Sequence, residues 1–434
     1  MKRVWGYNLL FALLLKVQFF CHALTVEEKF QNWLVDNGAT LRDVKLFKDP
    51  GRNYRGLMLT KDLQGGLSLD QGLVMLIPQG LVYSKSTVLA EKSIDLAHLF
   101  NSIVSNGTAI YGFEIMVTGL MMERLKGEES KWGPCIDMVN EEGQLHLPLN
   151  FYASNLNLIG FPQHDVQRIR QLKQFVSERY EILSKFIFPK IPSIEALSYA
   201  EAKSLYNWAY LYQYSHGNIQ TSKETNTLEE QMLCGITFLN HDGNARSYGP
   251  VTIGTELYQG VFITRQHVAG EEVFISYDSP GMKRHCNLVM FLRYGFVVGS
   301  DKLRDCYQLD VNMIHAPPTF AVSSNSESYF CEQDKYVHSP KKSVYILQEP
   351  FPSEILNVRL YSDTIPKACS YQLLRNFLSM EHQHILEGLD RRNDETRFGP
   401  MLTTILRGQL RILNFTVNRL SQMLDDDVRG HLSL

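Results

Sequence analysis

Three side chains with useful chemistry lie in one stretch of the sequence, between residues 238 and 278. Asn240 and His241 are neighbours, and Tyr277 closes the run 270–277, which reads Gly-Glu-Glu-Val-Phe-Ile-Ser-Tyr. A fold that packs these segments together would bring an amide, an imidazole and a phenol near one another. By composition alone they fit equally two ordinary strands, with the asparagine in a turn and the tyrosine in a core.

Two predicted strands would position these groups. Residues 257–264 alternate between apolar and polar side chains, which is typical of a half-buried strand. Residues 273–277 are rich in β-branched and aromatic side chains, which also favours a strand. The region therefore predicts a sheet that carries Tyr277 at one end.

The same stretch resembles the C-terminal half of a SET domain, the fold of protein methyltransferases that use S-adenosyl-L-methionine. The resemblance is strongest to the subclass typified by the Rubisco large-subunit methyltransferase. In that subclass an Asn-His pair binds the cofactor, and a Gly-Glu-x-(Val/Ile)-x-Ile-x-Tyr strand supplies the catalytic tyrosine. The matching positions here are Asn240, His241 and Tyr277.

Further segments extend the resemblance. The Arg55-Gly56 turn aligns with a Gly-x-Gly turn of the family, of which only the second glycine is present. Asn287 and Tyr294 match the segment that closes the domain. The resemblance implies that these four residues, with Asn240 and His241, bind the cofactor. His216 stands where relatives carry a cofactor-binding arginine, and Thr237 stands where they often carry Asp, so both positions depart from the pattern.

A longer local match lies at residues 123–134, which read Glu-Arg-Leu-Lys-Gly-Glu-Glu-Ser-Lys-Trp-Gly-Pro. It resembles the Glu-Arg-x-Lys-Gly-x-x-Ser-x-Trp-x-Pro-Tyr segment of the subclass. The resemblance implies a structural role, with Trp132 as the anchor between the SET core and a helical insert. Cys135 stands where the family has tyrosine.

Composition sets the outer limits. A chain of 434 residues with 44% hydrophobic side chains can bury a large core and form two or three domains. Its net charge of −3 gives no indication of a nucleic-acid or membrane-surface binder. The seven cysteines are far apart and form no Cys-x-x-Cys pair, which argues against a structural zinc site.

The N-terminus has the pattern of a secretory signal. Lys2 and Arg3 precede the apolar run 9–15, and Cys21-His22-Ala23 resembles a cleavage site. The run is too short to span a bilayer, which takes roughly 20 residues. The alternative is an amphipathic helix packed on the domain. The expected location is the secretory pathway, or an organelle entered through it, if the signal is real, and the cytoplasm otherwise.

Taken together, the sequence predicts an α+β fold in which a SET β-fold is split by a helical insert and followed by a mostly helical domain. The expected divisions are 1–23 for the signal, 24–300 for the SET domain with its insert at about 138–235, and 301–434 for a helical substrate-binding domain.

The resemblance implies a protein-lysine N-methyltransferase with S-adenosyl-L-methionine as cofactor and no metal. Expected partners are a protein substrate and no nucleic acid, with no membrane span, and the chain is expected to be a monomer. Two alternatives stay open: methylation of a histidine, and a silent SET scaffold that binds a protein partner. The departures at His216, Thr237 and the missing first glycine favour the scaffold, whereas intact Asn240, His241 and Tyr277 oppose it.

Overall fold

The structure is a computed structural model that divides the chain into two compact units. Unit 1 comprises residues 1–144 and 187–280, and unit 2 comprises residues 145–186 and 281–434. The structure describes residues 24–49, 54–91, 94–105, 110–140, 147–149, 158–221, 228–245, 248–278, 285–299, 304–310, 319–323, 328–332, 344–347, 367–392 and 398–432. The predicted signal at 1–23 lies outside the described residues.

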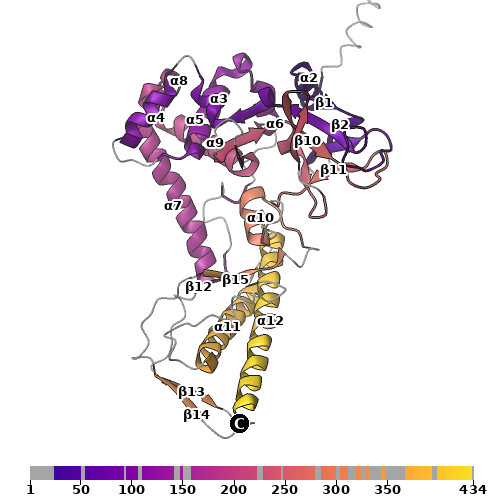
Figure 1. Cartoon of the computed structure of the whole chain (residues 1–434). Helices are drawn as coiled ribbons and strands as arrows, with labels where there is room; N and C mark the ends of the chain where they lie inside the picture. The colour runs from indigo at the N-terminus through magenta and orange to yellow at the C-terminus, as the bar shows by residue number, and fades with distance from the viewer. Residues whose placement is uncertain are drawn as a thin grey trace, which may run out of the picture. The chain divides into compact units, whose positions relative to one another are not determined.

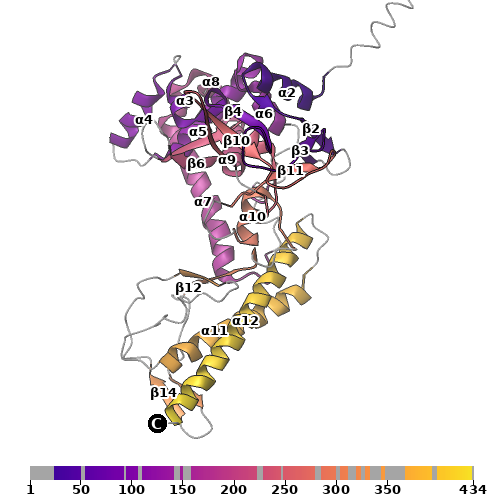
Figure 2. The same ribbon diagram turned by 45° about the vertical axis from the view of Figure 1, so that its right-hand side comes forward.

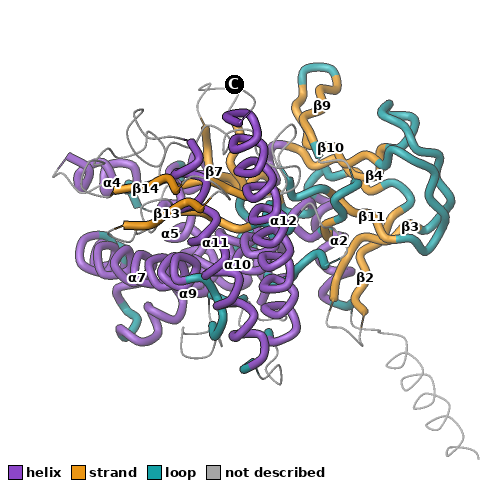
Figure 3. Tube along the Cα trace, turned by 90° about the horizontal axis from the view of Figure 1, so that it is seen from below, coloured by secondary structure: helices purple, strands orange, loops and turns teal. Residues whose placement is uncertain are grey.

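Three sheets form the β part of unit 1 (Figure 3). The first has the order β1-β4-β10-β9, the second β2-β3-β11-β8 and the third β5-β7-β6. Their bounds are β1 (Thr40–Leu41), β2 (Val44–Asp49), β3 (Tyr54–Leu59), β4 (Leu73–Pro78), β5 (Val82–Ser84), β6 (Asn218–Thr221), β7 (Leu228–Leu233), β8 (Asn240–His241), β9 (Gly249–Ile253), β10 (Glu256–Phe262) and β11 (Glu272–Ile275). The strands expected at 257–264 and 273–277 therefore form as β10 and β11, and Tyr277 lies just beyond the end of β11.

Helices surround these sheets in unit 1. They are α2 (Val26–Asp36), α3 (Lys85–Leu89), α4 (Leu96–Ser105), α5 (Gly112–Lys126), α6 (Gly133–Asn140), α8 (Pro192–Glu195) and α9 (Tyr199–His216), with short 3-10 turns η1 (Gln79–Leu81), η2 (Gly127–Glu129), η5 (Phe188–Lys190) and η6 (Ile236–Phe238). Helix α2 begins at a capping box of Thr25 and Glu28, which satisfies backbone N–H groups at the helix start. Its buried face carries Phe30 and Leu34. Pro192 occupies the first turn of α8, where its missing N–H costs nothing.

The segment 123–134 joins α5 to the rest of unit 1 as a packed corner. The Trp132 ring is 5% exposed and contacts the Tyr83 ring edge-on, with centroids 5.0 Å apart. The Arg124 guanidinium lies 4.2 Å from the centre of the Trp208 ring on α9, a favourable cation–π geometry. Lys126 Nζ bonds the carboxylates of Glu91 and Glu123. These contacts agree with the structural role expected for this segment.

Unit 2 is built on long helices that share one apolar core. Its elements are α7 (Gln163–Phe186), α10 (Asn287–Tyr294), α11 (Lys367–Asp390), α12 (Gly399–Leu432) and the hairpin strands β12 (Tyr307–Asp310), β13 (Thr319–Ser323), β14 (Ser328–Glu332) and β15 (Val344–Leu347). Figures 1 and 2 show α11 and α12 lying side by side. Leucines and isoleucines at helical spacing, such as Leu374 and Leu378 on α11 and Leu402 and Leu406 on α12, fill the core between them.

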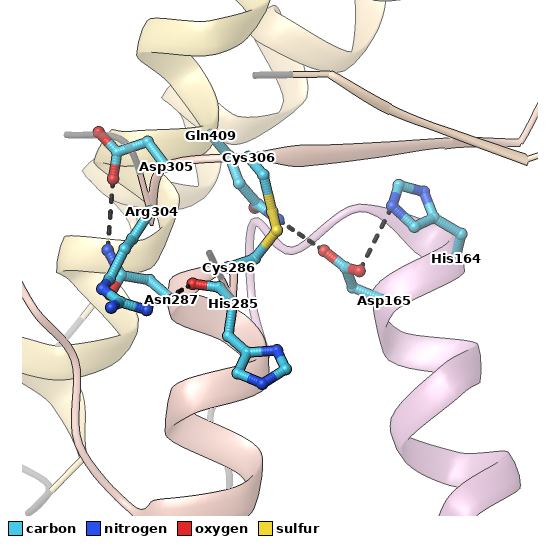
Figure 4. Close-up of a disulfide and its surroundings, with 9 residues drawn as sticks. All are labelled: His164, Asp165, His285, Cys286, Asn287, Arg304, Asp305, Cys306 and Gln409. Carbon is cyan, nitrogen blue, oxygen red and sulfur yellow. Dashed lines mark hydrogen bonds and ion pairs between the residues drawn. A yellow bond between two sulfur atoms is a disulfide. The ribbon is translucent and has the colours of Figure 1, made fainter. Parts of the chain in front are cut away.

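A disulfide between Cys286 and Cys306 lies within a polar cluster of unit 2 (Figure 4). Arg304 Nη1 donates to the His285 carbonyl at 3.1 Å. Nearby, Gln409 Nε2 donates to Asp165 Oδ2 at 2.7 Å. The bond was not expected from the cysteine spacing, because residues far apart in sequence reveal no pairing before the chain is folded.

The predicted α+β fold class is confirmed, because sheets and helices mix in unit 1 and long helices end the chain. The predicted domain boundaries stay a prediction. The part of the expected C-terminal helical domain that precedes residue 367 lies mostly outside the described residues. Over the part of the chain that the structure describes, every helix is too short or too polar to cross a membrane. In those same residues, no three His, Cys, Asp or Glu side chains are grouped to hold a metal ion.

Candidate active site

The pairing of β8 with β11 brings together three of the residues singled out from sequence. The two strands run parallel, with Asn240 opposite Phe274 and His241 opposite Ile275. Because Tyr277 follows β11 after one residue, it lies beside the Asn-His pair, although more than thirty positions separate them in the sequence. Strand β11 also pairs antiparallel with β3, which carries Arg55 and Gly56. One sheet therefore carries Arg55, Gly56, Asn240 and His241, and Tyr277 lies just beyond the end of its strand β11.

Tyr277 is held in place by two hydrogen bonds. Its hydroxyl donates to the carbonyl oxygen of Leu239 at 2.8 Å. Its backbone N–H donates to Nδ1 of His241 at 3.0 Å, and the two rings lie 5.1 Å apart between centroids. Since Nδ1 accepts this bond, the geometry assigns the proton of a neutral His241 to Nε2. The backbone of Tyr277 thus orients the imidazole, and the Leu239 carbonyl orients the phenol.

The Asn240 amide joins strand β8 to strand β3. Its Nδ2 group donates to the backbone carbonyl of Arg55 and, at 2.7 Å, to Glu272 Oε1. Gly56 makes room for this arrangement, because a Cβ atom there would stand 2.4 Å from Glu272 Oε1 and 2.8 Å from Phe47 Cε1. Any larger residue at Gly56 would displace the carboxylate that receives the Asn240 bond.

Arg55 is buried and carries no exposed charge into the site. Its Nε group bonds Glu27 Oε1 at 2.6 Å, and its Nη1 group donates to the Met138 carbonyl at 2.5 Å. Burial acts to raise the pKa of the Glu27 carboxyl, but the hydrogen bond and charge of Arg55 outweigh it, and the pKa is lowered from its ordinary value. The guanidinium therefore anchors β3 to α2 and α6.

His216 and Thr237, the two departures from the family pattern, both lie next to Phe238. The His216 ring is 5.9 Å from the Phe238 ring and 5.1 Å from the Tyr212 ring, and its Nδ1 lies 2.7 Å from Ser215 Oγ. The hydroxyl of Thr237 is buried, and among the described residues it has no hydrogen-bond partner. A buried polar atom in this condition needs a water or a ligand.

Asn287 and Tyr294 belong to unit 2, on α10. Asn287 is 3% exposed, and its Oδ1 accepts from the Val298 N–H at 2.9 Å. Its Nδ2 reaches Asp305 Oδ1 at 3.4 Å (Figure 4). The Tyr294 ring lies 6.1 Å from the Phe296 ring. Both residues are described within their own unit, and their expected role in cofactor binding stays a prediction.

Several residues of the site were not found from sequence. Leu239 contributes only a carbonyl, which no pattern of side chains reveals. Glu272 lies in the run that resembles the family strand, but nothing in the sequence pairs it with Asn240. Glu27 and Met138 reach the site through Arg55, and such distant partners appear only in the folded chain.

The arrangement fits a polar cofactor at the level of its donor and acceptor atoms. No described residue donates to Oδ1 of Asn240, which leaves this oxygen as an acceptor beside β8. The Thr237 hydroxyl adds a second polar atom that the described chain does not satisfy. The ammonium and amino groups of S-adenosyl-L-methionine would be suitable donors to such oxygens.

Comparisons with known proteins place the fold. No family model matches the sequence, and no curated protein matches it. Solved structures do match: the SET domain of LSMT bound to lysine and AdoHcy aligns with a TM-score of 0.63 over 92% of each chain at 15% identity. Rubisco LSMT bound to sinefungin and monomethyllysine aligns with a TM-score of 0.62, and the AdoMet complex with 0.61; each pair is 15% identical over 93% of this chain and 94% of the other. The chain therefore has the fold of these SET-domain structures.

Proposed function

We propose that this chain is an S-adenosylmethionine-dependent protein-lysine N-methyltransferase. The observation that carries the proposal is the parallel register of β8 and β11. It holds the Tyr277 hydroxyl against the Leu239 carbonyl, directly beside Asn240 and His241. The resemblance implies catalytic and cofactor-binding roles for these three positions, and their proximity in the fold supports the proposal.

The matched structures add support of a different kind. Those LSMT structures are bound to lysine, monomethyllysine, AdoHcy, AdoMet or sinefungin. These ligands belong to those proteins, and at 15% identity only the fold carries over. The proposal for this chain therefore depends on its own residues.

The chain's part in the reaction begins with holding the cofactor, which would supply an electrophilic methyl group on a sulfonium. Asn240 Oδ1 and the Thr237 hydroxyl would accept hydrogen bonds from its N–H groups. Glu272 keeps the Asn240 amide from rotating, because it receives one of its N–H bonds. A fixed amide costs no reorganisation when the ligand binds.

Tyr277 would orient the amine. Its proton is already donated to Leu239, so the phenol oxygen presents lone pairs and acts as an acceptor toward a substrate N–H. A lysine amine in water has a pKa of about 10.4, so it must lose a proton before it can attack. A dry channel disfavours the charged amine, and an oriented acceptor holds the neutral nitrogen in line with the methyl group.

The test begins with binding. Calorimetric titration of the full chain with S-adenosylmethionine should show one saturable site. Transfer of labelled methyl to a proteome extract, followed by hydrolysis and amino-acid analysis, should then yield methyl-lysine. Recovery of labelled methyl-histidine instead would show that the chain methylates histidine.

The silent scaffold remains the second candidate function, and one observation favours it. The Asn240 amide and the Arg55 guanidinium are both engaged by groups of the chain itself. In a silent scaffold these N–H groups would serve only the packing of the chain and would bind no cofactor. Absence of detectable binding by the correctly folded wild type would establish this reading and exclude the methyltransferase.

A further inference from the structure

A second disulfide lies beneath the candidate active site in unit 1. Cys135 on α6 is bonded to Cys234, which follows β7, and the two Cα atoms lie 5.9 Å apart. Both residues are fully buried, and 99 positions of sequence separate them. The bond therefore joins two distant parts of the chain inside the core.

A buried tyrosine fixes the Cys135 end of this bond. The Tyr212 hydroxyl donates to the Cys135 carbonyl at 3.0 Å and lies 3.6 Å from its sulfur. Burial raises the pKa of Tyr212, so the phenol remains a neutral donor. The same ring contacts His216 edge-on at 5.1 Å. Helix α9 thus connects the disulfide with the side chains beside Phe238.

The Cys234 end of the disulfide lies close in sequence to strand β8, which carries Asn240 and His241. Residues 235–239 alone separate Cys234 from Asn240, and Ile236 and Leu239 among them are buried. Gly235 turns the chain at a φ of +106°, and a Cβ atom there would lie 3.0 Å from Ile77 Cδ1. Such a short, buried connection passes a restraint at Cys234 on to Leu239 and Asn240.

Hydrogen bonds return from Asn240 to the Cys135 helix. Asn240 donates to the Arg55 carbonyl, and the Arg55 guanidinium donates to the carbonyl of Met138. Met138 lies one helical turn beyond Cys135 on α6. The disulfide, the segment 234–240, Arg55 and α6 therefore form a closed ring of covalent and hydrogen bonds. We call it the disulfide ring.

We propose that Cys135 and Cys234 are positioning residues for methyl transfer, and that the chain binds its cofactor well only while they are joined. The inference rests on the proposed function for its activity readout. Neither sulfur touches the reacting atoms: the bond acts through Leu239, which holds the Tyr277 hydroxyl, and through Asn240. Opening the ring at its one covalent side-chain link allows the segment 234–241 to leave β11.

The chemical step that opens the ring is a two-electron reduction. A dithiol transfers two electrons and two protons to the Cys135–Cys234 bond, which becomes two thiols, while the dithiol closes to its own disulfide. Disulfides persist in oxidising compartments and are rare in reducing ones. We therefore expect the substrate to be a protein in the same oxidising compartment as this chain. The Cys286–Cys306 bond of unit 2 is consistent with the same compartment.

The experiment compares the full wild-type chain with the double variant Cys135→Ser/Cys234→Ser. Ser198→Ala serves as a destabilised control, because it removes the N-cap of α9 in the same unit and leaves the disulfide ring intact. Non-reducing peptide mapping should find the 135–234 link in the wild type. The double variant should bind S-adenosylmethionine roughly tenfold more weakly, as expected if only about a tenth of molecules keep a competent site. Its KM for cofactor should rise by a similar factor, whereas the control should melt earlier with unchanged cofactor affinity.

Hydrogen exchange gives a readout that needs no cofactor. Amides of residues 54–59 and 235–241 should exchange faster in the double variant than in Ser198→Ala. If the variant does not fold, the wild type can be reduced stepwise with dithiothreitol, and alkylation with peptide mapping shows which thiols are free. The variant Cys286→Ser/Cys306→Ser then measures how much of the change in exchange and affinity comes from the second disulfide. Free thiols at both positions of the native chain, or unchanged exchange and affinity after reduction, would overturn the proposal. A wild type that exchanges faster at these amides after reduction but binds no cofactor would refute the proposed function, and only the structural link between the disulfide and residues 235–241 would remain.

Discussion

The hydroxyl of Tyr277 donates a hydrogen bond of 2.8 Å to the backbone carbonyl of Leu239. This bond joins the end of β11 to the residue before β8, so it lies across the parallel pair that forms the candidate site. It also decides the chemical character of the phenol, whose oxygen is left as an acceptor.

Replacing Tyr277 with phenylalanine should slow methyl transfer severely and leave the fold intact. The ring stays, so packing changes little, and only the hydroxyl and its bond to Leu239 are lost. Removal of one preorganised hydrogen-bonding group at a reacting centre costs roughly 100-fold in kcat. Steady-state transfer of labelled methyl, with calorimetry for the cofactor, measures the split between kcat and affinity.

Wild-type activity in the Tyr277→Phe variant, with an unaltered melt, would remove Tyr277 from the mechanism. Tyr258→Phe is the matched control, because Tyr258 lies on β10, which belongs to a different sheet of the same unit. It should transfer methyl at the wild-type rate.

Replacing Asn240 with alanine should weaken cofactor binding and lower stability. The change removes both N–H donors and leaves the Glu272 carboxylate without one of its partners. A partner left unsatisfied in this way costs about 1–3 kcal/mol. Isothermal titration and thermal melts report the two effects. Asn244→Ala, at an exposed position in the following turn, should change neither; equal behaviour of the two variants would argue against a role for the Asn240 amide.

Replacing Glu27 with glutamine should destabilise the chain at neutral pH and change how stability depends on pH. The pKa of Glu27 is lowered in the folded chain by Arg55, against the opposing effect of burial. A lowered pKa gives stability that is present above the unfolded value and is lost as pH falls through the folded value. The loss on substitution should be about 1–3 kcal/mol at pH 7, the cost of a charged hydrogen bond, and should shrink in acid.

Thermal melts of both chains between pH 3 and pH 7, a span chosen to cover roughly the carboxylate range, check this sign. The control is Glu28→Gln, because glutamine can also serve in the capping box with Thr25. A difference between wild type and Glu27→Gln that stays constant with pH would show that the carboxylate charge is not involved.

Asp165 in unit 2 predicts the opposite pH dependence. Burial raises its pKa, and His164 and the hydrogen bond from Gln409 only partly oppose this. A raised pKa means that stability is fully present below the unfolded pKa and is lost as pH rises through the folded one. Asp165→Asn keeps an oxygen for Gln409 and loses the buried charge, so its melting temperature relative to wild type should increase as pH rises. A relative melting temperature that falls with rising pH would reverse the assignment.

The sequence alone determined the local elements and the identity of the reactive groups. Alternation predicted β10, and the β-branched run predicted β11. These patterns depend on neighbours within a few residues, and the chain keeps them wherever the elements finally lie. Resemblance then selected Asn240, His241 and Tyr277 from many polar residues.

Tertiary structure decided what those residues touch. The parallel pairing of β8 with β11 places Leu239 under the Tyr277 hydroxyl, and β3 brings the Arg55 carbonyl to Asn240. The partner of Cys135 is 99 positions away, and no local pattern carries information over that distance. Contacts between distant segments are fixed only when burial of the whole core selects one packing. For that reason the sequence could identify Tyr277 as a candidate catalytic residue, whereas the disulfide ring appears only in the folded chain.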